Sequence, residues 1–161
     1  MNETPRGFSL IELLIVVAII LIIAAIAIPS LLRSRIAADQ ASAIASLRVI
    51  NTSEVNYVSS YGQGYSSTLV QLGPPVGATA VNSQAAGMMD SVLAGGLKSG
   101  YTFNYVPANP DVNGNYTTFG VTASPIQVGT TGTSYYYTDQ TYVIRGNTTG
   151  TASAADSPVA Q

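Results

Sequence analysis

The sequence predicts an α+β protein in which one long N-terminal helix packs on a small antiparallel β-sheet. Apolar residues run without interruption from Leu13 to Ile28, and apolar side chains then recur at near-helical spacing as far as Val58. After residue 100, short segments rich in Tyr, Thr, Val or Phe are bounded by Gly, Pro, Asn or Asp, which is typical of strands and turns. A chain of 161 residues has room for one such domain and an anchor.

The composition excludes several classes of function. The chain has no Cys and no His, which removes disulfides, thiolate metal sites, thiol nucleophiles and the commonest general base. Charged residues make up 9% of the chain, against about 25% in an ordinary soluble domain. Lys98 and Arg145 are the only basic residues after Arg48, so there is no strong nucleic-acid signal. The scattered carboxylates show no pairing, and we expect neither catalytic residues nor a cofactor.

A single carboxylate stands near the start of the apolar run. Gly7 is followed by Phe8-Ser9-Leu10-Ile11-Glu12, and the stretch from Leu10 to Leu32 exceeds the roughly 20 residues that a membrane-spanning helix needs. A charge inside such a segment costs on the order of 2.5–3.5 kcal/mol on insertion scales. Glu12 is therefore expected to have a function and a partner.

Two ordinary interpretations of this segment leave Glu12 unexplained. A cleaved secretory signal needs a basic start and a small-residue site after the apolar core, but Arg6 is offset by Glu3. A plain membrane anchor fits the length, and Arg33 with Arg35 after it argues weakly for an N-terminus on the outer side. Neither interpretation gives a reason for a carboxylate at this position.

The leader ending in Gly7, the five residues from Phe8 to Glu12 and the apolar helix with Pro29 near its end together resemble a type IV prepilin. That family comprises pilus subunits and the pseudopilins of type II secretion, and its heads form a pilin-like α/β roll. The resemblance implies that residues 1–7 are a leader peptide, which a prepilin peptidase removes after Gly7 while the new amine of Phe8 is methylated. It also implies that Glu12 acts in subunit assembly.

The resemblance further implies a structural subunit of a type IV pilus-like filament, without enzymatic activity. Its partners would be further copies of itself in a helical homo-oligomer, the prepilin peptidase/methyltransferase, membrane lipid and an inner-membrane assembly platform. The precursor would cross the inner membrane once and then enter a cell-surface or periplasmic filament. The alternatives are a pseudopilin of type II secretion and, in a different class, a membrane-anchored binding module that does not polymerise. Motility, adhesion, DNA uptake and secretion are all compatible with the sequence.

We expect one helix from about Ser9 to Val58, because Gly and Pro are absent between Ser30 and Tyr61. At 1.5 Å per residue it would be about 75 Å long, which is too long for one small domain to cover. Pro29 predicts a kink rather than an end, since apolar periodicity resumes directly after it. The charged residues of the second half, Glu54 among them, fall largely outside the apolar pattern.

Residues 34–146 are predicted to form the globular head, after a hydrophobic transmembrane and assembly helix over 8–33. Two glycines in Tyr61-Gly62-Gln63-Gly64 end the long helix, and 65–100 is an irregular connection with one short helix over 85–93. Alternation places Tyr101, Phe103 and Tyr105 on one face, which would pack on the helix. Residues 147–161, without apolar periodicity, are predicted to be a flexible tail. The expected strands are 101–106, 116–123, 134–138 and 141–145.

One segment between two predicted strands has weak metal-binding character. Asp111, Asn113 and Asn115 place oxygen side chains at alternate positions, as at the start of a calcium loop. The segment departs from the EF-hand pattern, with Tyr116 where glycine is expected and Thr122 where a bidentate Glu is expected. We therefore interpret it as a turn, with calcium as the weaker alternative.

Overall fold

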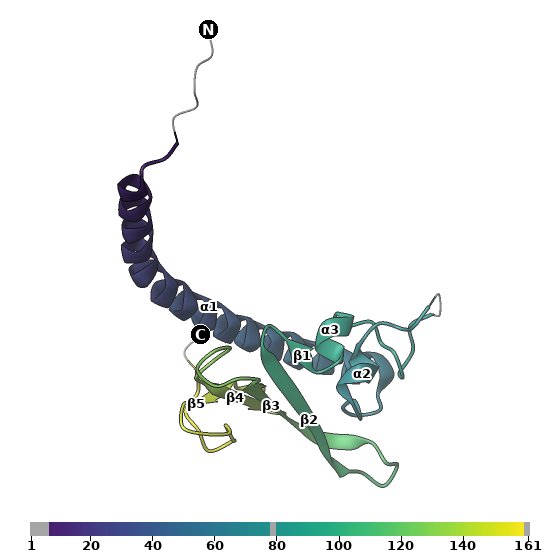
Figure 1. The fold of residues 1–161 in the computed structure, drawn as a ribbon. Helices are drawn as coiled ribbons and strands as arrows, with labels where there is room; N and C mark the ends of the chain where they lie inside the picture. The colour runs from purple at the N-terminus through teal and green to yellow at the C-terminus, as the bar shows by residue number, and fades with distance from the viewer. Residues whose placement is uncertain (1–6, 78–79, 160–161) are drawn as a thin grey trace. The chain divides into compact units, whose positions relative to one another are not determined.

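The computed structural model describes residues 7–77 and 80–159. The chain divides into two compact units, Met1–Arg35 and Ile36–Gln161. The predicted α+β class, a long N-terminal helix with a small antiparallel sheet, is confirmed (Figure 1). The helices are α1 (Leu10–Tyr61), α2 (Leu69–Leu72) and α3 (Ser91–Ala94), and the strands are β1 (Leu97–Lys98), β2 (Tyr101–Pro110), β3 (Tyr116–Pro125), β4 (Tyr135–Asp139) and β5 (Arg145–Asn147).

The first unit contains the apolar N-terminal part of α1. Its large apolar side chains are exposed, from 45% at Val17 to 78% at Leu10. By length and composition, α1 is the one helix in the described part of the chain that could cross a membrane. The helix continues through Pro29, whose ring lacks the N–H that would bond to the preceding turn. The helix therefore does not end at this proline, and the kink at Pro29 stays a prediction.

The second unit is built on the C-terminal part of α1. Ala43, Leu47, Ile50 and Tyr57 follow one another at intervals of four, three and seven residues, which place them on one side of the helix, and they are at most 3% exposed, so they form one buried stripe. Burial of a side chain such as Leu47 contributes about 1.5–3 kcal/mol. The stripe shares a single apolar cluster with the sheet residues Tyr101, Phe103, Phe119, Val121, Ala123 and Tyr136, and Tyr105 packs against it, as the predicted alternation requires.

The sheet is an antiparallel meander with strand order β1-β2-β3-β4-β5. Its longest pairing joins β2 to β3, from Tyr101↔Pro125 to Pro110↔Tyr116. Figure 1 shows these two strands as one long hairpin of the second unit. The expected strands at 101–106, 116–123 and 134–138 correspond to β2, β3 and β4, and β2 extends further than expected.

The last predicted strand, 141–145, was placed too early, because β5 covers Arg145–Asn147. Residues 139–142 form a turn instead. Asp139 Oδ1 accepts hydrogen bonds from the backbone N–H and the hydroxyl of Thr141, and Tyr142 has a φ of 59°. Asp side chains often bond the backbone two residues on and so stabilise turns. This local bond overrides the strand preference of Thr141 and Tyr142.

The short elements before the sheet also differ from expectation. The helix predicted over 85–93 is a single turn, α3, and it starts later, at Ser91. Asp90 sets this start, because its carboxylate accepts hydrogen bonds from Val92 N and Leu93 N. The sequence analysis did not anticipate α2 or β1, which have four and two residues and are too short for periodicity to reveal.

The C-terminal segment differs from the flexible tail that we expected. Gly146 N donates to Ser157 O at 3.0 Å, and Val159 N donates to Ile144 O at 2.8 Å. Ala152 is only 3% exposed. The segment therefore returns along the outer edge of β5 and covers backbone groups that an edge strand would otherwise leave open.

Candidate processing and assembly site

The junction before α1 is open to its surroundings. Gly7 and Phe8 precede the helix, and Phe8 is 84% exposed. A Cβ atom placed on Gly7 would meet nothing within 4 Å among the described residues. Close packing against this part of the chain therefore does not require glycine at position 7.

The N-terminus of α1 has a capping arrangement that the sequence analysis missed. Ser9 N donates to Glu12 Oε2 at 2.9 Å, and Leu13 N donates to Ser9 O at 3.2 Å. A Ser followed three residues later by Glu is the capping-box pattern, and that spacing was the available sequence signal. The Glu12 carboxylate thus satisfies one free N–H and places its charge at the positive end of the helix dipole.

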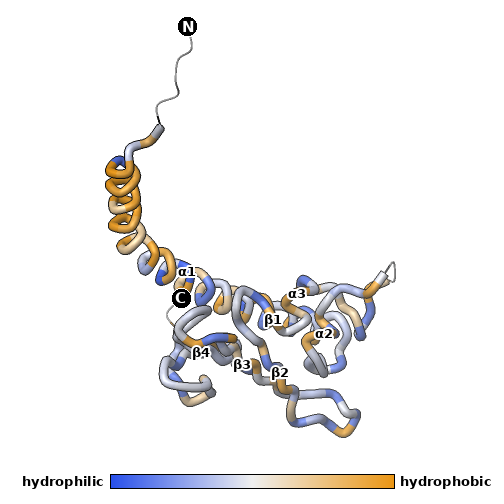
Figure 2. The backbone as a smooth tube through the Cα atoms, viewed as in Figure 1, coloured by the Kyte–Doolittle hydropathy of each residue, from blue (hydrophilic) through white to orange (hydrophobic). Residues whose placement is uncertain are grey.

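The surface that follows Glu12 on α1 is apolar on all sides. Figure 2 shows this part of the helix as strongly hydrophobic. It includes exposed Ile20, Ile26 and Leu31. A contiguous apolar surface of this extent is unusual on a soluble monomer and marks a site of contact with lipid or with other proteins. The arrangement therefore combines an accessible chain junction, one carboxylate and an apolar helix.

The comparison with protein families places this junction in a known motif. The family described as the prokaryotic N-terminal methylation motif matches residues 5–28. The N-terminal segment carries the methylation motif of prokaryotic prepilins. Gly7, Phe8 and Glu12 all lie inside the matched range, and so does most of the exposed apolar surface. The prepilin resemblance drawn from these residues is confirmed.

A curated relative supports the same prepilin assignment. Over 58 residues the chain is 45% identical to the type IV major pilin protein PilA of Myxococcus xanthus (strain DK1622). The match spans 36% of this chain and 26% of the relative, so the chain spans about a quarter of that protein's length. No solved structure matches the chain at a significant level.

Outside the prepilin motif, the calcium candidate forms the turn between β2 and β3. Asp111 Oδ1 accepts hydrogen bonds from Asn113 N at 2.8 Å and from Asn115 N at 2.9 Å. These backbone bonds, above all that from Asn115, lower the pKa of Asp111. Gly114 has a φ of 84°, which suits a tight turn. The described residues contain no group of three or more Asp, Glu, His or Cys side chains placed to hold a metal. Calcium binding by Asp111, Asn113 and Asn115 stays the weaker alternative to the predicted turn.

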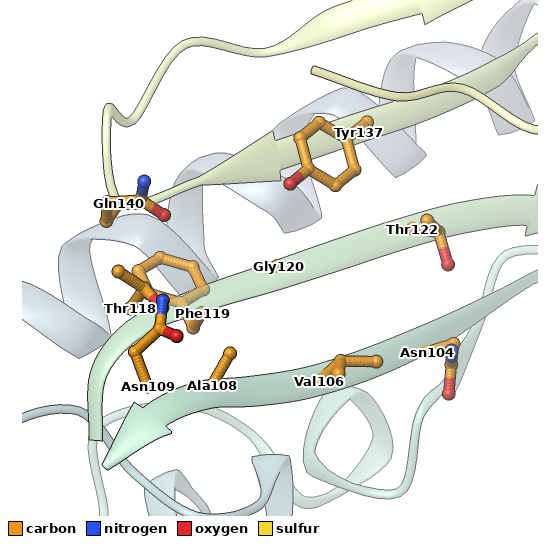
Figure 3. A pocket seen from close by; sticks show the side chains of 10 residues that line it. All are labelled: Asn104, Val106, Ala108, Asn109, Thr118, Phe119, Gly120, Thr122, Tyr137 and Gln140. Carbon is orange, nitrogen blue, oxygen red and sulfur yellow. The ribbon is translucent and has the colours of Figure 1, made fainter. Parts of the chain in front are cut away.

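A shallow pocket of about 300 Å³ lies on the face of the sheet opposite the apolar core (Figure 3). The ring of Tyr137 lies over Gly120, where a Cβ atom would come within 3.2 Å of the phenol oxygen. The lining contains amides, hydroxyls, aliphatic groups and aromatic rings but no charged side chain, so it offers hydrogen bonds and no acid or base. Its residues are Asn104, Val106, Ala108, Asn109, Thr118, Phe119, Gly120, Thr122, Tyr137 and Gln140.

Proposed function

We propose that this chain is the precursor of a structural subunit of a type IV pilus-like filament. The observation that carries the proposal is the continuity between the methylation motif at residues 5–28 and a helix whose apolar side chains are exposed on all sides. The similarity to a type IV major pilin favours a pilus over the pseudopilus of type II secretion.

The first step is cleavage after Gly7 by a prepilin peptidase, followed by methylation of the Phe8 amine. Two observations support this site. The junction is exposed, so a peptidase can reach it, and no described residue packs closely enough on Gly7 to require glycine there. Glycine at position 7 is then needed by the peptidase, because its active site must approach the backbone of the substrate closely.

Before assembly, the apolar half of α1 anchors the precursor in the inner membrane. Moving this helix from lipid into a helical bundle gains little hydrophobic free energy, because lipid tails are as apolar as Leu and Ile. Close packing and polar contacts must therefore drive assembly on the inner-membrane platform. The Glu12 carboxylate is the polar group available for that role, since it lies beside the exposed apolar surface.

Cleavage supplies the partner that Glu12 needs. It creates a positive amine on Phe8, at the same end of the helix as the Glu12 carboxylate. A charge buried without a partner is costly. A subunit that enters the bundle therefore stops at the position where its Glu12 carboxylate pairs with the Phe8 amine of a neighbouring subunit. This pairing fixes the axial position of each subunit, and the heads remain on the outside of the filament.

The test is expression of the full chain with a prepilin peptidase and its assembly machinery. Intact-mass measurement should give a mature chain that starts at Phe8 and carries one added methyl group. Electron microscopy of material sheared from the cells should show long filaments that contain it. A chain that keeps Met1 contradicts the prepilin assignment. A processed chain that yields only short periplasmic fibres, in cells that also have a secretin, identifies a pseudopilin.

A further inference from the structure

The head contains a carboxyl group that the proposed filament function does not use. Glu54 lies on α1 between Ile50 and Tyr57, within the buried stripe, and its exposed fraction is 0%. The expectation that Glu54 falls outside the apolar pattern was therefore wrong. The spacing of 47, 50, 54 and 57 is the signal that could have revealed it.

Glu54 connects three parts of the head. Its Oε2 accepts a hydrogen bond from Ser66 N at 3.1 Å, and its Oε1 lies 2.6 Å from Ser66 Oγ. Ser66 Oγ lies 3.2 Å from the phenol oxygen of Tyr105 on β2, and this phenol donates to Ser66 O at 2.8 Å. We call Glu54, Ser66 and Tyr105 the Glu54 network. It links α1, the segment 62–68 that follows the helix, and the sheet.

In the part of the chain that the structure describes, no cation balances a negative charge on Glu54. Among the described residues, the ion pair that the structure contains joins Lys98 to Asp90, and Arg145 Nη1 donates to Asp156 O. The ionisable groups that face Glu54 are the phenols of Tyr57 on α1, Tyr105 on β2 and Tyr142 between β4 and β5. A phenol supplies no positive charge, so an ionised Glu54 would be buried and uncompensated.

The number of protons in the network distinguishes the two states of Glu54. The network has one oxygen–oxygen contact between Glu54 and Ser66, one between Ser66 and Tyr105, and one between Tyr105 and Ser66 O. With an ionised carboxylate only two hydroxyl protons serve these three contacts. With a carboxylic acid, Glu54 donates to Ser66 Oγ, Ser66 donates to Tyr105, and Tyr105 donates to the carbonyl. Every contact then has its proton.

We propose that Glu54 is held as a neutral carboxylic acid and acts as a pH-operated latch that fastens the segment 62–68 to α1. The same segment is attached to the sheet by the bond from Tyr105 to Ser66 O and by Tyr65, whose N–H donates to Tyr116 O at 2.9 Å. A side chain at position 64 could not strengthen this attachment, because a Cβ atom on Gly64 would collide with the carbonyl oxygen of Tyr116. Ionisation of Glu54 removes one proton from the network and opens this connection. The latch concerns the head alone and does not depend on filament assembly.

Burial raises the pKa of Glu54 and outweighs the hydrogen bonds from Ser66 and Tyr105, which act in the opposite direction. A carboxyl group whose pKa is higher in the folded state stabilises the fold fully below its unfolded pKa of about 4.3. That stabilisation is lost as the pH rises through the folded pKa. A rising pH therefore releases the segment, and a falling pH fastens it.

The test compares two full-length proteins in detergent micelles, the wild type and the variant Glu54→Gln. The amide of Gln donates to Ser66 Oγ and accepts from Ser66 N, so this variant reproduces the protonated pattern at every pH. Hydrogen exchange of residues 62–68 gives the opening constant. The ratio of the wild-type constant to the Glu54→Gln constant should rise about tenfold for each pH unit above about pH 4.3 and level off at the folded pKa. A ratio that does not change with pH overturns the proposal.

Two further measurements separate the latch from simple burial. Infrared spectra of the wild type at a pH below the midpoint of the hydrogen-exchange effect should contain the carbonyl band of a protonated carboxylic acid, which Glu54→Gln removes and Asp39→Asn leaves in place. Tyr105→Phe keeps an aromatic ring but removes the acceptor that the acid form needs, so the midpoint of the pH effect should move to lower pH. A missing carbonyl band, or a midpoint that stays or moves to higher pH in Tyr105→Phe, contradicts the latch.

Discussion

Asn51 on α1 and Thr138 on β4 exchange two hydrogen bonds inside the core of the head. Asn51 Nδ2 donates to Thr138 Oγ1 at 2.9 Å, and Thr138 Oγ1 donates to Asn51 Oδ1 at 3.1 Å. Thr138 is fully buried and Asn51 is 8% exposed. Because apolar contacts are not directional, this polar pair contributes to fixing how far along the helix the sheet docks.

Replacing either partner of this pair should destabilise the head, and the two losses should not be additive. Thr138→Val keeps the shape of the side chain but leaves the buried Asn51 amide without its partner, which should cost about 1–3 kcal/mol. Asn51→Leu should cost a similar amount, since Tyr142 O also loses its donor. Urea unfolding of the full chain in detergent micelles, followed by near-ultraviolet circular dichroism, measures these losses.

The double variant Asn51→Leu/Thr138→Val should lose clearly less than the sum of the two single losses, because no unpaired group remains between the two positions. Thr52→Val is the matched control. Its hydroxyl donates to Arg48 O on the exposed side of α1, and we expect a change within about 0.5 kcal/mol. Strictly additive losses would mean that the two residues do not act as a pair.

The C-terminal segment should open when Asp156 loses its carboxylate. Asp156 Oδ1 accepts from Asn147 Nδ2 at 2.8 Å, and Oδ2 accepts from Ser153 N at 2.7 Å. In Asp156→Ala these bonds are lost, so limited proteolysis within residues 148–159 should become faster. Ser157→Ala, which keeps the backbone bond to Gly146, is the control and should be cleaved at the wild-type rate.

The same segment should open at acidic pH. The backbone bond from Ser153 lowers the pKa of Asp156, so its stabilising effect is complete above the unfolded pKa of about 3.9. It is lost as the pH falls through the lower folded pKa. Hydrogen exchange of 148–159 should therefore gain an acid-dependent opening that Asp156→Ala lacks. Equal opening in both proteins down to about pH 2 would count against this role.

The fold was predictable where periodicity extends over many residues. The long helix follows from an apolar run and a repeating stripe that includes Leu47 and Ile50, and β2 follows from the alternation of Tyr101 and Phe103. The order of the tail was not predictable from these patterns. It depends on contacts such as Asp156 with Asn147, and the composition of residues 147–161 is typical of a loose segment.

The candidate site was partly visible in the sequence. Glu12 was recognisable because a carboxylate in an apolar segment is costly, whereas its bond to Ser9 followed from a capping pattern that was overlooked. Glu54 was missed because a single Glu on an amphipathic helix is usually solvent-exposed. Its burial depends on Ser66 and Tyr105, which are distant in sequence and offer the hydrogen bonds that make it tolerable.

Calcium should not change the stability of the head. The Asp111 carboxylate already accepts hydrogen bonds from Asn113 N and Asn115 N, so binding a cation would require this turn to rearrange. The melting temperature of the full chain in micelles should be the same with calcium and with a chelator. Asp111→Ala should loosen the hairpin equally in both conditions. A calcium-dependent rise in melting temperature that Asp111→Ala abolishes would replace the turn assignment with a metal site.

Gly7→Val should block maturation without disturbing the fold. A Cβ atom at this position meets no atom of the described residues within 4 Å, so the helix and the head are expected to be unaffected. The branched side chain would crowd the peptidase, and the uncut precursor should accumulate in the membrane. Intact mass reports cleavage and circular dichroism reports folding. Gly7→Ala, with the smallest possible side chain, should be cut more slowly than the wild type but faster than Gly7→Val.

Removing the charge of Glu12 should prevent assembly while leaving maturation intact. We expect Glu12→Ala to be cleaved after Gly7 and to stay in the membrane, because the apolar helix is unchanged. It should form no filaments alone, since it cannot pair with the Phe8 amine of a neighbouring subunit. Co-expressed with the wild type, it should enter filaments only as a minority subunit. Intact mass measures maturation, and electron microscopy of sheared material measures assembly.

Glu12→Gln separates this pairing from the capping of α1. Its side-chain oxygen can accept the hydrogen bond from Ser9 N, as Gln does in a capping box, but it carries no charge. If capping were the whole function of Glu12, this variant would assemble like the wild type. If the charge holds neighbouring subunits in register, Glu12→Gln should fail as Glu12→Ala does, because an uncharged amide leaves the buried amine of the neighbour uncompensated. Abundant normal filaments from Glu12→Gln alone would therefore show that the ion pair does not drive assembly.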